Sequence, residues 1–194
     1  NLLLHLLACW LLLCLIGRVT RQRPVTFFGC AAALLFGLHP VLTEAVLVPA
    51  FREDLLVTVF ILLYLLASLE EGRIRWLSLP LLFCALLSKE SAVIAPLLLF
   101  SLWLRFPSAR PSGNRDRVLL GAGALIVCGL LLVWRRSGSF QAASEEWATL
   151  GIQFPRNLYT APWLWIKNLH LLAWPHPLQA DYVINGIARI GDPR

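Results

Sequence analysis

The sequence predicts an all-α protein: a polytopic bundle of about six transmembrane helices followed by an interfacial helix. Hydrophobic residues make up 58% of the 194 residues, charged residues make up 14%, and the mean hydropathy is +0.71. This composition is too apolar for a water-soluble domain. Several apolar runs approach the roughly 20 residues that a helix needs to cross a hydrocarbon core of about 30 Å, and none alternates as a barrel strand does.

The first span is expected over residues 2–16. No basic segment precedes this run and no small-residue cleavage pattern follows it, so it does not read as a signal peptide. The further spans are expected over residues 25–38, 55–69, 76–87, 92–104 and 118–134. Because the chain begins with Asn1 inside an apolar run and contains no Met, we expect a fragment of a membrane domain that has lost its N-terminus.

The chain after the sixth span is less apolar. Residues 135–155 are expected to form an exterior loop, and residues 157–174 mix aromatic and polar side chains as an interfacial helix does. The segment that follows is rich in turn residues. The predicted organisation is therefore a helical bundle over residues 1–134, with an exterior loop and interfacial helix over residues 135–194 in the same membrane domain.

Basic residues gather in the connections that follow the first, third and fifth spans. They are Arg18, Arg21, Arg23, Arg73, Arg75, Arg105, Arg110, Arg115 and Arg117. The opposite connections hold far fewer basic residues, so the three arginine-rich connections are expected on the cytoplasmic side. The net charge of +6 therefore reflects topology, not a nucleic-acid patch. Five cysteines lie in apolar runs without a CxxC pair, which favours buried thiols over disulfides or a metal site.

The connection between the second and third spans is the first candidate site. It holds His39, Glu44, Arg52, Glu53 and Asp54 among apolar residues. A polar exterior loop with a carboxylate capping the next helix would be a sufficient structural explanation. The apolar filling instead indicates a segment pressed against the membrane or other helices, where ionisable groups are costly and favour a functional role.

Two further segments hold candidate residues on the same side. Lys89 and Glu90 form a turn between two short apolar runs, which predicts a position below the membrane surface. This turn is either a solvated helix cap or a site in which Lys89 pairs with an anionic phosphate, with Glu44 or with Asp54. The third segment holds His176, Asp181 and Tyr182, for which a proline-bracketed turn is an adequate explanation. We expect His5 and His170 to serve packing or interfacial roles.

Taken together, these segments resemble integral-membrane glycosyltransferases of the GT-C class, in particular the protein O-mannosyltransferase-like branch that carries tetratricopeptide repeats. The matching motifs are His39-Pro40-Val41-x-Thr43-Glu44-Ala45-Val46, Arg52-x-Asp54-Leu55-Leu56, Ala85-Leu86-Leu87-Ser88-Lys89-Glu90 and Trp174-Pro175-x-Pro177-Leu178-x-Ala180-Asp181-Tyr182. Their order and spacing fit along nearly the whole chain. The repeats themselves do not occur in it.

The resemblance implies transfer of a mannose-like sugar from a polyprenyl-phosphate donor to a protein or glycan hydroxyl on the periplasmic or luminal face. A carboxylate would deprotonate the acceptor while cationic groups stabilise the leaving phosphate. Lys89 and Arg52 would face the phosphate, and Glu44 and Asp54 would orient them. The family's acidic pair, which supplies the base, would lie upstream, so the fragment alone is expected to be inactive. Phe51-Arg52-Glu53-Asp54 departs from the family's usual Gly-Arg-Ala-Asp pattern, so a different local backbone and a different role for Arg52 stay open.

Other functions stay open at this stage. A transporter or flippase for a lipid-linked or anionic substrate would use the same charges, although the sequence shows no inverted repeat. A catalytically silent membrane scaffold is the third reading. The sequence contains no dedicated metal cage, while a divalent cation bound partly by phosphate stays open. The expected partners are the lipid bilayer, the polyprenyl-phosphate sugar donor and the protein or glycan acceptor, and nucleic acid is not expected to bind. For the location of the protein, a bacterial inner membrane is favoured over the endoplasmic reticulum.

Overall fold

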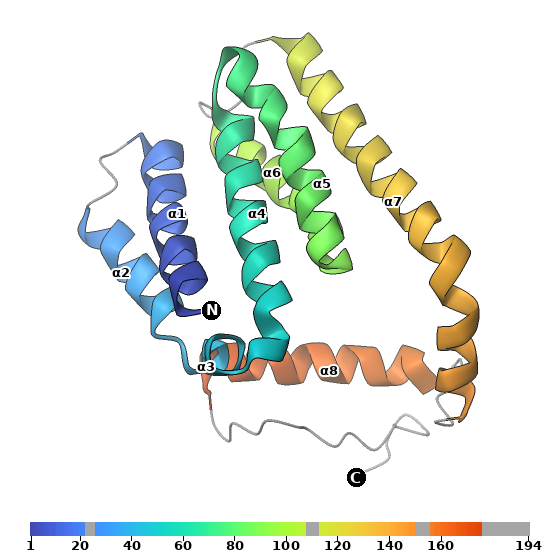
Figure 1. Ribbon diagram of the computed structural model, residues 1–194. Coiled ribbons are helices and arrows are strands. Elements are labelled where there is room, and N and C mark those ends of the chain that lie inside the picture. The colour runs from blue at the N-terminus through green and yellow to red at the C-terminus, as the bar shows by residue number, and fades with distance from the viewer. Residues whose placement is uncertain (22–25, 108–112, 150–155, 176–194) are drawn as a thin grey trace. The chain divides into compact units, whose positions relative to one another are not determined.

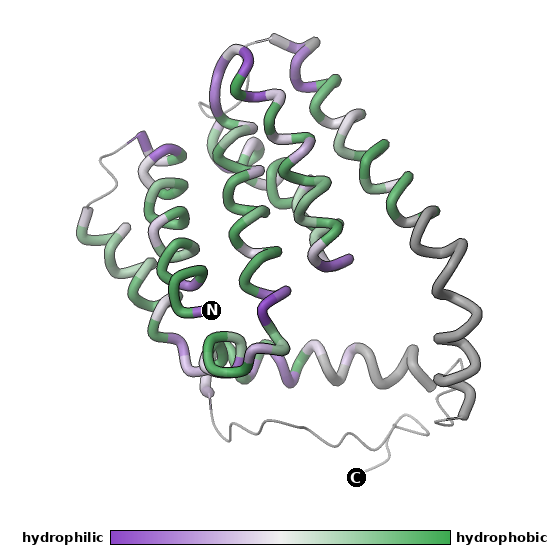
Figure 2. Tube along the Cα trace, in the orientation of Figure 1, coloured by the Kyte–Doolittle hydropathy of each residue, from purple (hydrophilic) through white to green (hydrophobic). Residues whose placement is uncertain are grey.

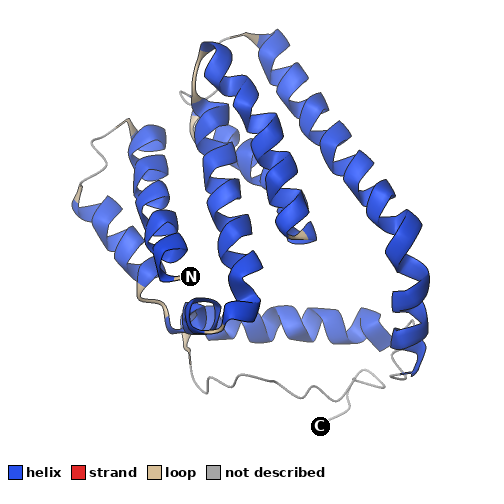
Figure 3. Cartoon of the chain, in the orientation of Figure 1, coloured by secondary structure: helices blue, strands red, loops and turns tan. Residues whose placement is uncertain are grey.

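The computed structural model describes residues 1–21, 26–107, 113–149 and 156–175. Within these ranges every regular element is a helix (Figure 3), which confirms the all-α prediction. The chain divides into two compact units, Asn1–Val133 and Trp134–Arg194. The candidate residues that the structure describes all belong to the first unit.

Eight α-helices are present in the described part of the chain (Figure 1). They are α1 Leu2–Thr20, α2 Phe27–Gly37, α3 Thr43–Leu47, α4 Arg52–Leu69, α5 Ser78–Ser88, α6 Ala95–Arg105, α7 Asn114–Thr149 and α8 Arg156–Ala173. Four 3₁₀ segments join them: η1 Pro40–Leu42, η2 Pro49–Phe51, η3 Gly72–Leu77 and η4 Glu90–Ile94. Each of the six expected spans coincides with an α-helix, and α8 coincides with the expected interfacial helix.

The expected loop over residues 135–155 is wrong as far as Thr149, because α7 continues to that residue. The sequence between Ser137 and Thr149 holds three Ala, two Glu and one Gln, which are good helix formers, and contains no proline. A fall in hydropathy therefore marks a change in polarity there and not the end of the helix. The polar connection expected up to Asp54 also differs, because α4 already begins at Arg52.

Helix α4 is the central element of the first unit. It packs against α1, α5, α6 and η3, and residues on all its sides are buried, including Leu55, Val57, Tyr64 and Leu65. In contrast, α7 contributes a single stripe, Leu120, Ala124, Cys128 and Leu131, whose spacing of three or four residues defines one helix face. The core of this unit is therefore built around α4.

Helix α1 is apolar on every side but only partly covered by protein. Its core-facing residues include Ala8 and Leu11, while Leu3 and Trp10 are exposed. Only 33% of its apolar window is buried within the protein. A helix that is apolar all round and is not buried in a core needs a lipid environment. Figure 2 shows the same distribution, with hydrophobic residues along the helices of this unit and hydrophilic residues where they end.

The expected six spans are not confirmed. Among the described residues, α1 alone has the length and hydropathy of a membrane span, and α2 together with Pro40–Leu47, bent by 47°, makes at most a second. Helices α5 and α6 have 11 residues each, which corresponds to about 16 Å of helix. Helix α4 carries Arg52, Glu53 and Asp54 in its first turn, so its apolar part is shorter than the whole helix.

Five hydroxyl groups on the helices are satisfied locally, whereas the buried Ser78 hydroxyl of α5 has no partner among the described residues. Thr20, Thr58, Ser68, Ser88 and Ser101 each donate to the carbonyl four residues earlier, at 2.7 to 2.9 Å. This back-bonding leaves no demand for water, which is the condition for placing a hydroxyl in an apolar environment.

Ion pairs join the expected cytoplasmic connections at one end of the first unit. Arg18, near the end of α1, lies 3.1 Å from Glu70, just after α4. Arg75 in η3 lies 2.5 Å from Asp116 in the first turn of α7, and its side chain is only 6% exposed. The connections after the first, third and fifth expected spans therefore contribute residues to the same end, as the alternation of basic residues predicted.

Candidate functional site

The candidate site begins at the first turn of α4. The 3₁₀ segment η1 and the short helix α3 bring the chain from His39 to Pro49. The next segment, η2, leads directly into α4 at Arg52. Glu53 and Asp54 lie in the first helical turn, where unpaired backbone N–H groups and the helix dipole stabilise negative charge. The sequence therefore places two adjacent carboxylates at the N-terminus of α4.

Lys89 lies opposite these carboxylates. It follows Ser88, the last residue of α5, and its extended backbone, with φ −158° and ψ 140°, ends that helix. Its Nζ lies 2.5 Å from Asp54 Oδ1 and 3.3 Å from Glu53 Oε1. The predicted pairing of Lys89 with Asp54 is thus present, across 35 residues of sequence.

The electrostatics of this cluster favour a charged ammonium. The hydrogen bond from Lys89 to Asp54 raises the pKa of the Lys89 amine, against the opposing effect of burial, and Glu53 adds to the increase. The three side chains are half-buried to exposed, at 31% for Lys89, 37% for Asp54 and 53% for Glu53. The cluster is therefore accessible to a ligand while its charges stay paired.

A cavity of about 500 Å³ opens beside Asp54. Its polar lining residues include Glu44, Asp54, Thr58 and Ser91, which come from α3, α4 and η4. Its apolar lining residues include Ala8, Phe36, Leu55, Val57, Ile61 and Ile94. Because both carboxylates and hydrocarbon side chains line the cavity, it suits an amphipathic ligand.

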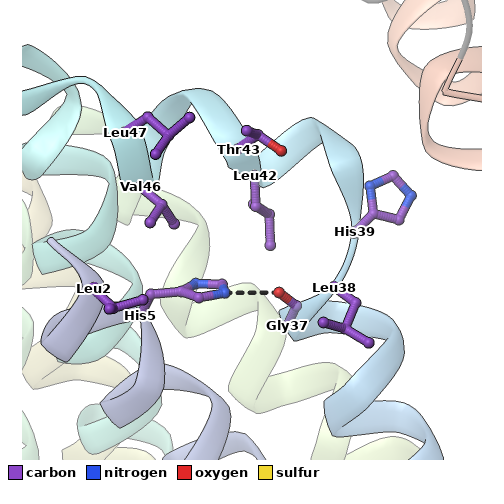
Figure 4. A pocket seen from close by; sticks show the side chains of 9 residues that line it. All are labelled: Leu2, His5, Gly37, Leu38, His39, Leu42, Thr43, Val46 and Leu47. Atoms are coloured by element: carbon purple, nitrogen blue, oxygen red, sulfur yellow. Dashed lines mark hydrogen bonds between the residues drawn. The ribbon is translucent and has the colours of Figure 1, made fainter.

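The other candidates in the described chain have separate surroundings. His39 accepts a hydrogen bond from the Val41 N–H at 3.3 Å and lines a smaller cavity of about 220 Å³ (Figure 4). Arg52 donates from Nε to Asn1 Oδ1 at 3.2 Å, so it contacts the first residue before α1. Glu90 is exposed at the start of η4. The structure thus joins Lys89 to Asp54 and places Glu44 on the cavity that Asp54 lines.

The third motif is described only up to Pro175. His176, Asp181 and Tyr182 lie outside the described residues. The predicted contribution of Asp181 and Tyr182 to the site therefore stays a prediction.

Two residues of the site were given no site role from sequence, although Glu53 lies in the first candidate connection. Glu53 is the second carboxylate on Lys89, and its position beside Asp54 in one helical turn was the available signal. His5, which we expected to pack, is buried and lines both cavities. Its spacing from Ala8 places it on the buried face of α1, which was a signal for burial but not for a cavity.

The fold supports the class of integral membrane proteins, because one long helix is apolar enough to cross a membrane, and the site places paired charges at one end of a helical unit. Comparison with curated proteins then identifies relatives over nearly the whole chain. Protein O-mannosyl-transferase Tmtc1 of Drosophila melanogaster is 32% identical over 98% of this chain, and protein O-mannosyl-transferase Tmtc2 of the same fly is 32% identical over 98%. A protein O-mannosyl-transferase of Caenorhabditis elegans is 30% identical over 84%.

Over nearly its whole length the chain is therefore similar to protein O-mannosyl-transferases, two of them named Tmtc, in agreement with the resemblance found from its motifs. It spans 25%, 22% and 24% of the length of these three relatives. All three are animal proteins, which does not favour the bacterial inner membrane that we preferred from sequence. No protein-family model matches the chain. No solved structure matches it.

Proposed function

We propose that the complete protein is a glycosyltransferase that moves a mannose-like sugar from a polyprenyl-phosphate-linked donor to an acceptor hydroxyl on the non-cytoplasmic face. The names of the relatives support transfer of mannose to protein. The observation that carries the choice of site is the contact between Lys89 and Asp54 beside the larger cavity. It unites two of the three sequence motifs at one position.

The assignment to the non-cytoplasmic face rests on the two ends of the first unit. Arg18 and Arg75 mark the end to which the arginine-rich connections belong, and these are expected to stay in the cytoplasm. Lys89 and Asp54 lie where α5 ends and α4 begins, away from the connection that joins those two helices. We propose that residues 1–134 form six spans, in which the short helices α5 and α6 hold the Lys89 turn below the membrane surface.

The chemistry of Lys89 suits a phosphate ligand. An ammonium group has three hydrogen-bond donors, and among the described residues Asp54 and Glu53 account for two of them. The third is available for a phosphate oxygen without loss of either carboxylate contact. In the proposed mechanism, Lys89 stabilises the leaving lipid phosphate, Asp54 orients Lys89, and Glu44 shapes the acceptor side of the cavity. Arg52 is proposed as a second phosphate contact.

The mixed lining of the cavity supports a lipid-linked donor. Leu55, Val57 and Ile61 of α4 and Phe36 of α2 supply an apolar wall, which a prenyl chain would cover with a gain from apolar burial. The carboxylates and hydroxyls on the other part of the wall suit a sugar. The competing proposal of a transporter is not favoured, because the relatives are named transferases.

The test measures sugar transfer by the complete protein in liposomes with radiolabelled polyprenyl-phosphate mannose and an acceptor protein. Wild type is compared with Lys89→Ala and Glu44→Gln. Matched controls are Arg73→Ala and Glu71→Gln, which remove the same charges from exposed residues of the arginine-rich end. We expect transfer to fall strongly in the two site variants and to persist in both controls. Movement of the lipid-linked sugar without transfer by the wild type would overturn the proposal in favour of a transporter.

A further inference from the structure

His5 is a buried imidazole at the boundary between the two cavities. It lies in the second turn of α1 and is only 6% exposed. It lines both the cavity of about 220 Å³ and the cavity of about 500 Å³. Its ring stacks on Phe36, with centroids 5.9 Å apart and an interplanar angle of 28°. The ring is therefore held in place between two spaces that a ligand can occupy.

One ring nitrogen has a defined partner. His5 Nε2 lies 2.9 Å from the carbonyl oxygen of Gly37, the last residue of α2 (Figure 4). The helix ends there, and the Val41 N–H that would continue it donates to His39 Nδ1. The Gly37 carbonyl thus depends on an outside donor, which His5 supplies. Because a carbonyl only accepts, the proton of the neutral imidazole is on Nε2.

The other ring nitrogen is then an acceptor. Nδ1 of His5 is buried and has no hydrogen-bond partner among the described residues. The Cys9 thiol lies 4.0 Å from Nε2, so it does not serve Nδ1. Leaving a buried acceptor unpaired costs free energy, and such groups in native proteins are usually satisfied by water or by a ligand.

We propose that His5 is a substrate-binding residue whose Nδ1 accepts a hydrogen bond from a ligand hydroxyl, the chemistry of a sugar. A phosphodiester has no O–H to donate, so this atom selects the hydroxyl-bearing part of the ligand and not its phosphate. Asp54 lines the same larger cavity as His5. A donor whose phosphate lies at Lys89 would therefore direct its sugar towards α1. This inference rests on the proposed glycosyl transfer.

Two substitutions separate the roles of the two nitrogens. In His5→Gln the side-chain amide can reach the Gly37 carbonyl in place of Nε2–H, but nothing replaces Nδ1. In His5→Asn a polar atom lies near the position of Nδ1, but the side chain is too short to hold Gly37. A purely structural role predicts that His5→Gln behaves like the wild type and that His5→Asn is impaired. If Nδ1 binds a ligand hydroxyl, His5→Gln is instead expected to lose recognition of the hydroxyl, and His5→Asn is expected to keep part of it.

The experiment measures the binding of mannosyl-polyprenyl phosphate and of polyprenyl phosphate without sugar to the complete protein in detergent. The wild type is expected to bind mannosyl-polyprenyl phosphate more tightly than polyprenyl phosphate, and the ratio of the two affinities is the sugar advantage. In His5→Gln this advantage is expected to fall about tenfold, while the melting temperature of the protein stays that of the wild type. His5→Asn is expected to melt earlier and to keep part of the advantage. Unchanged sugar dependence in His5→Gln would overturn the proposal.

Two further measurements use the wild type and the reaction. Donors that each lack one sugar hydroxyl are compared, and loss of binding for one of them is expected to match the His5→Gln loss. If the hydroxyl belongs to the acceptor instead, His5→Gln raises the KM for the acceptor and not for the donor. No loss with any of these ligands would refute the role of Nδ1. If His5→Gln loses binding of the sugar and the wild type transfers no sugar, the binding site stands and the proposed transferase activity is wrong. If the wild type transfers sugar and His5→Gln binds the ligands normally, the transferase activity stands and the role of His5 is wrong.

Discussion

The cluster at Lys89 predicts two unequal coupling energies. Lys89→Met removes the ammonium but keeps much of the side-chain volume, and Asp54→Asn and Glu53→Gln each neutralise one partner. An exposed ion pair contributes about 0.2 to 1 kcal/mol, and a hydrogen bond to a charged group contributes about 1.5 to 3 kcal/mol when it is buried. Lys89 and Asp54 are 31% and 37% exposed at 2.5 Å, so we expect a coupling of about 1 kcal/mol. For Glu53, 53% exposed and at 3.3 Å, we expect about 0.3 kcal/mol.

Double-mutant cycles measure these couplings. The free energy of unfolding of the complete protein is determined in detergent for the wild type, the three single variants and the two double variants that include Lys89→Met. A larger coupling with Asp54 than with Glu53 is the expected result. Equal couplings, or no coupling with Asp54, would refute the assignment of Asp54 as the principal partner of Lys89.

The same cluster gives a pH dependence with a definite sign. The pKa of Lys89 is raised above the ordinary lysine value of 10.5, first by its hydrogen bond to Asp54. A group with a raised pKa in the folded state contributes stability fully below its unfolded pKa and loses it as pH rises through the folded value. The difference in stability between wild type and Lys89→Met is therefore expected to stay constant from about pH 6 to 9 and to shrink only above about pH 10.5. A difference that disappears near pH 7 would contradict this reading.

Three further changes test the packing of the first unit. Asp116→Asn is expected to cost about 1 to 2 kcal/mol in chemical unfolding, since it leaves the buried Arg75 charge without its partner, and a cost below about 0.5 kcal/mol would argue against the pair. Arg18→Ala is expected to cost less than Asp116→Asn in the same assay, because its ion pair is 45% and 40% exposed. A Cβ at Gly37 would lie 2.9 Å from Cys9 Sγ, so Gly37→Ala should cost about 1 kcal/mol and Cys9→Ala should restore part of it. An additive loss in the double variant would disprove that contact.

Hydropathy predicted where the helices lie but not where they end. Each expected span contains a helix, because an apolar run of sufficient length satisfies its backbone internally only as a helix. The ends differ because apolar composition marks contact with lipid, whereas a helix continues wherever its backbone bonds continue. Thus α4 begins at Arg52, three residues before the apolar run, and α7 extends to Thr149.

The site was predictable in outline because topology places alternate connections on the same side. This argument brought Lys89 and Asp54 to the same face, and the structure joins them. It gave no information on side-chain reach, which is why Glu53 was not expected as a second partner. His5 was also beyond prediction as a cavity residue, since its environment depends on where α2 ends at Gly37 and on the Val41 N–H being directed to His39.

The contrast between Arg75 and Lys89 supports the proposal that the ligand binds at Lys89 and not at Arg75. Arg75 is 6% exposed, and its guanidinium is engaged by Asp116 and by the Glu70 carbonyl, so a ligand could reach it only by breaking a buried ion pair. Lys89 is 31% exposed, and the described residues leave it one donor beyond its two carboxylates. Its principal partner, Asp54, lines a cavity that Arg75 does not reach. The pair at Arg75 therefore holds helices together, while the proposed function assigns the more exposed Lys89 to an anionic ligand.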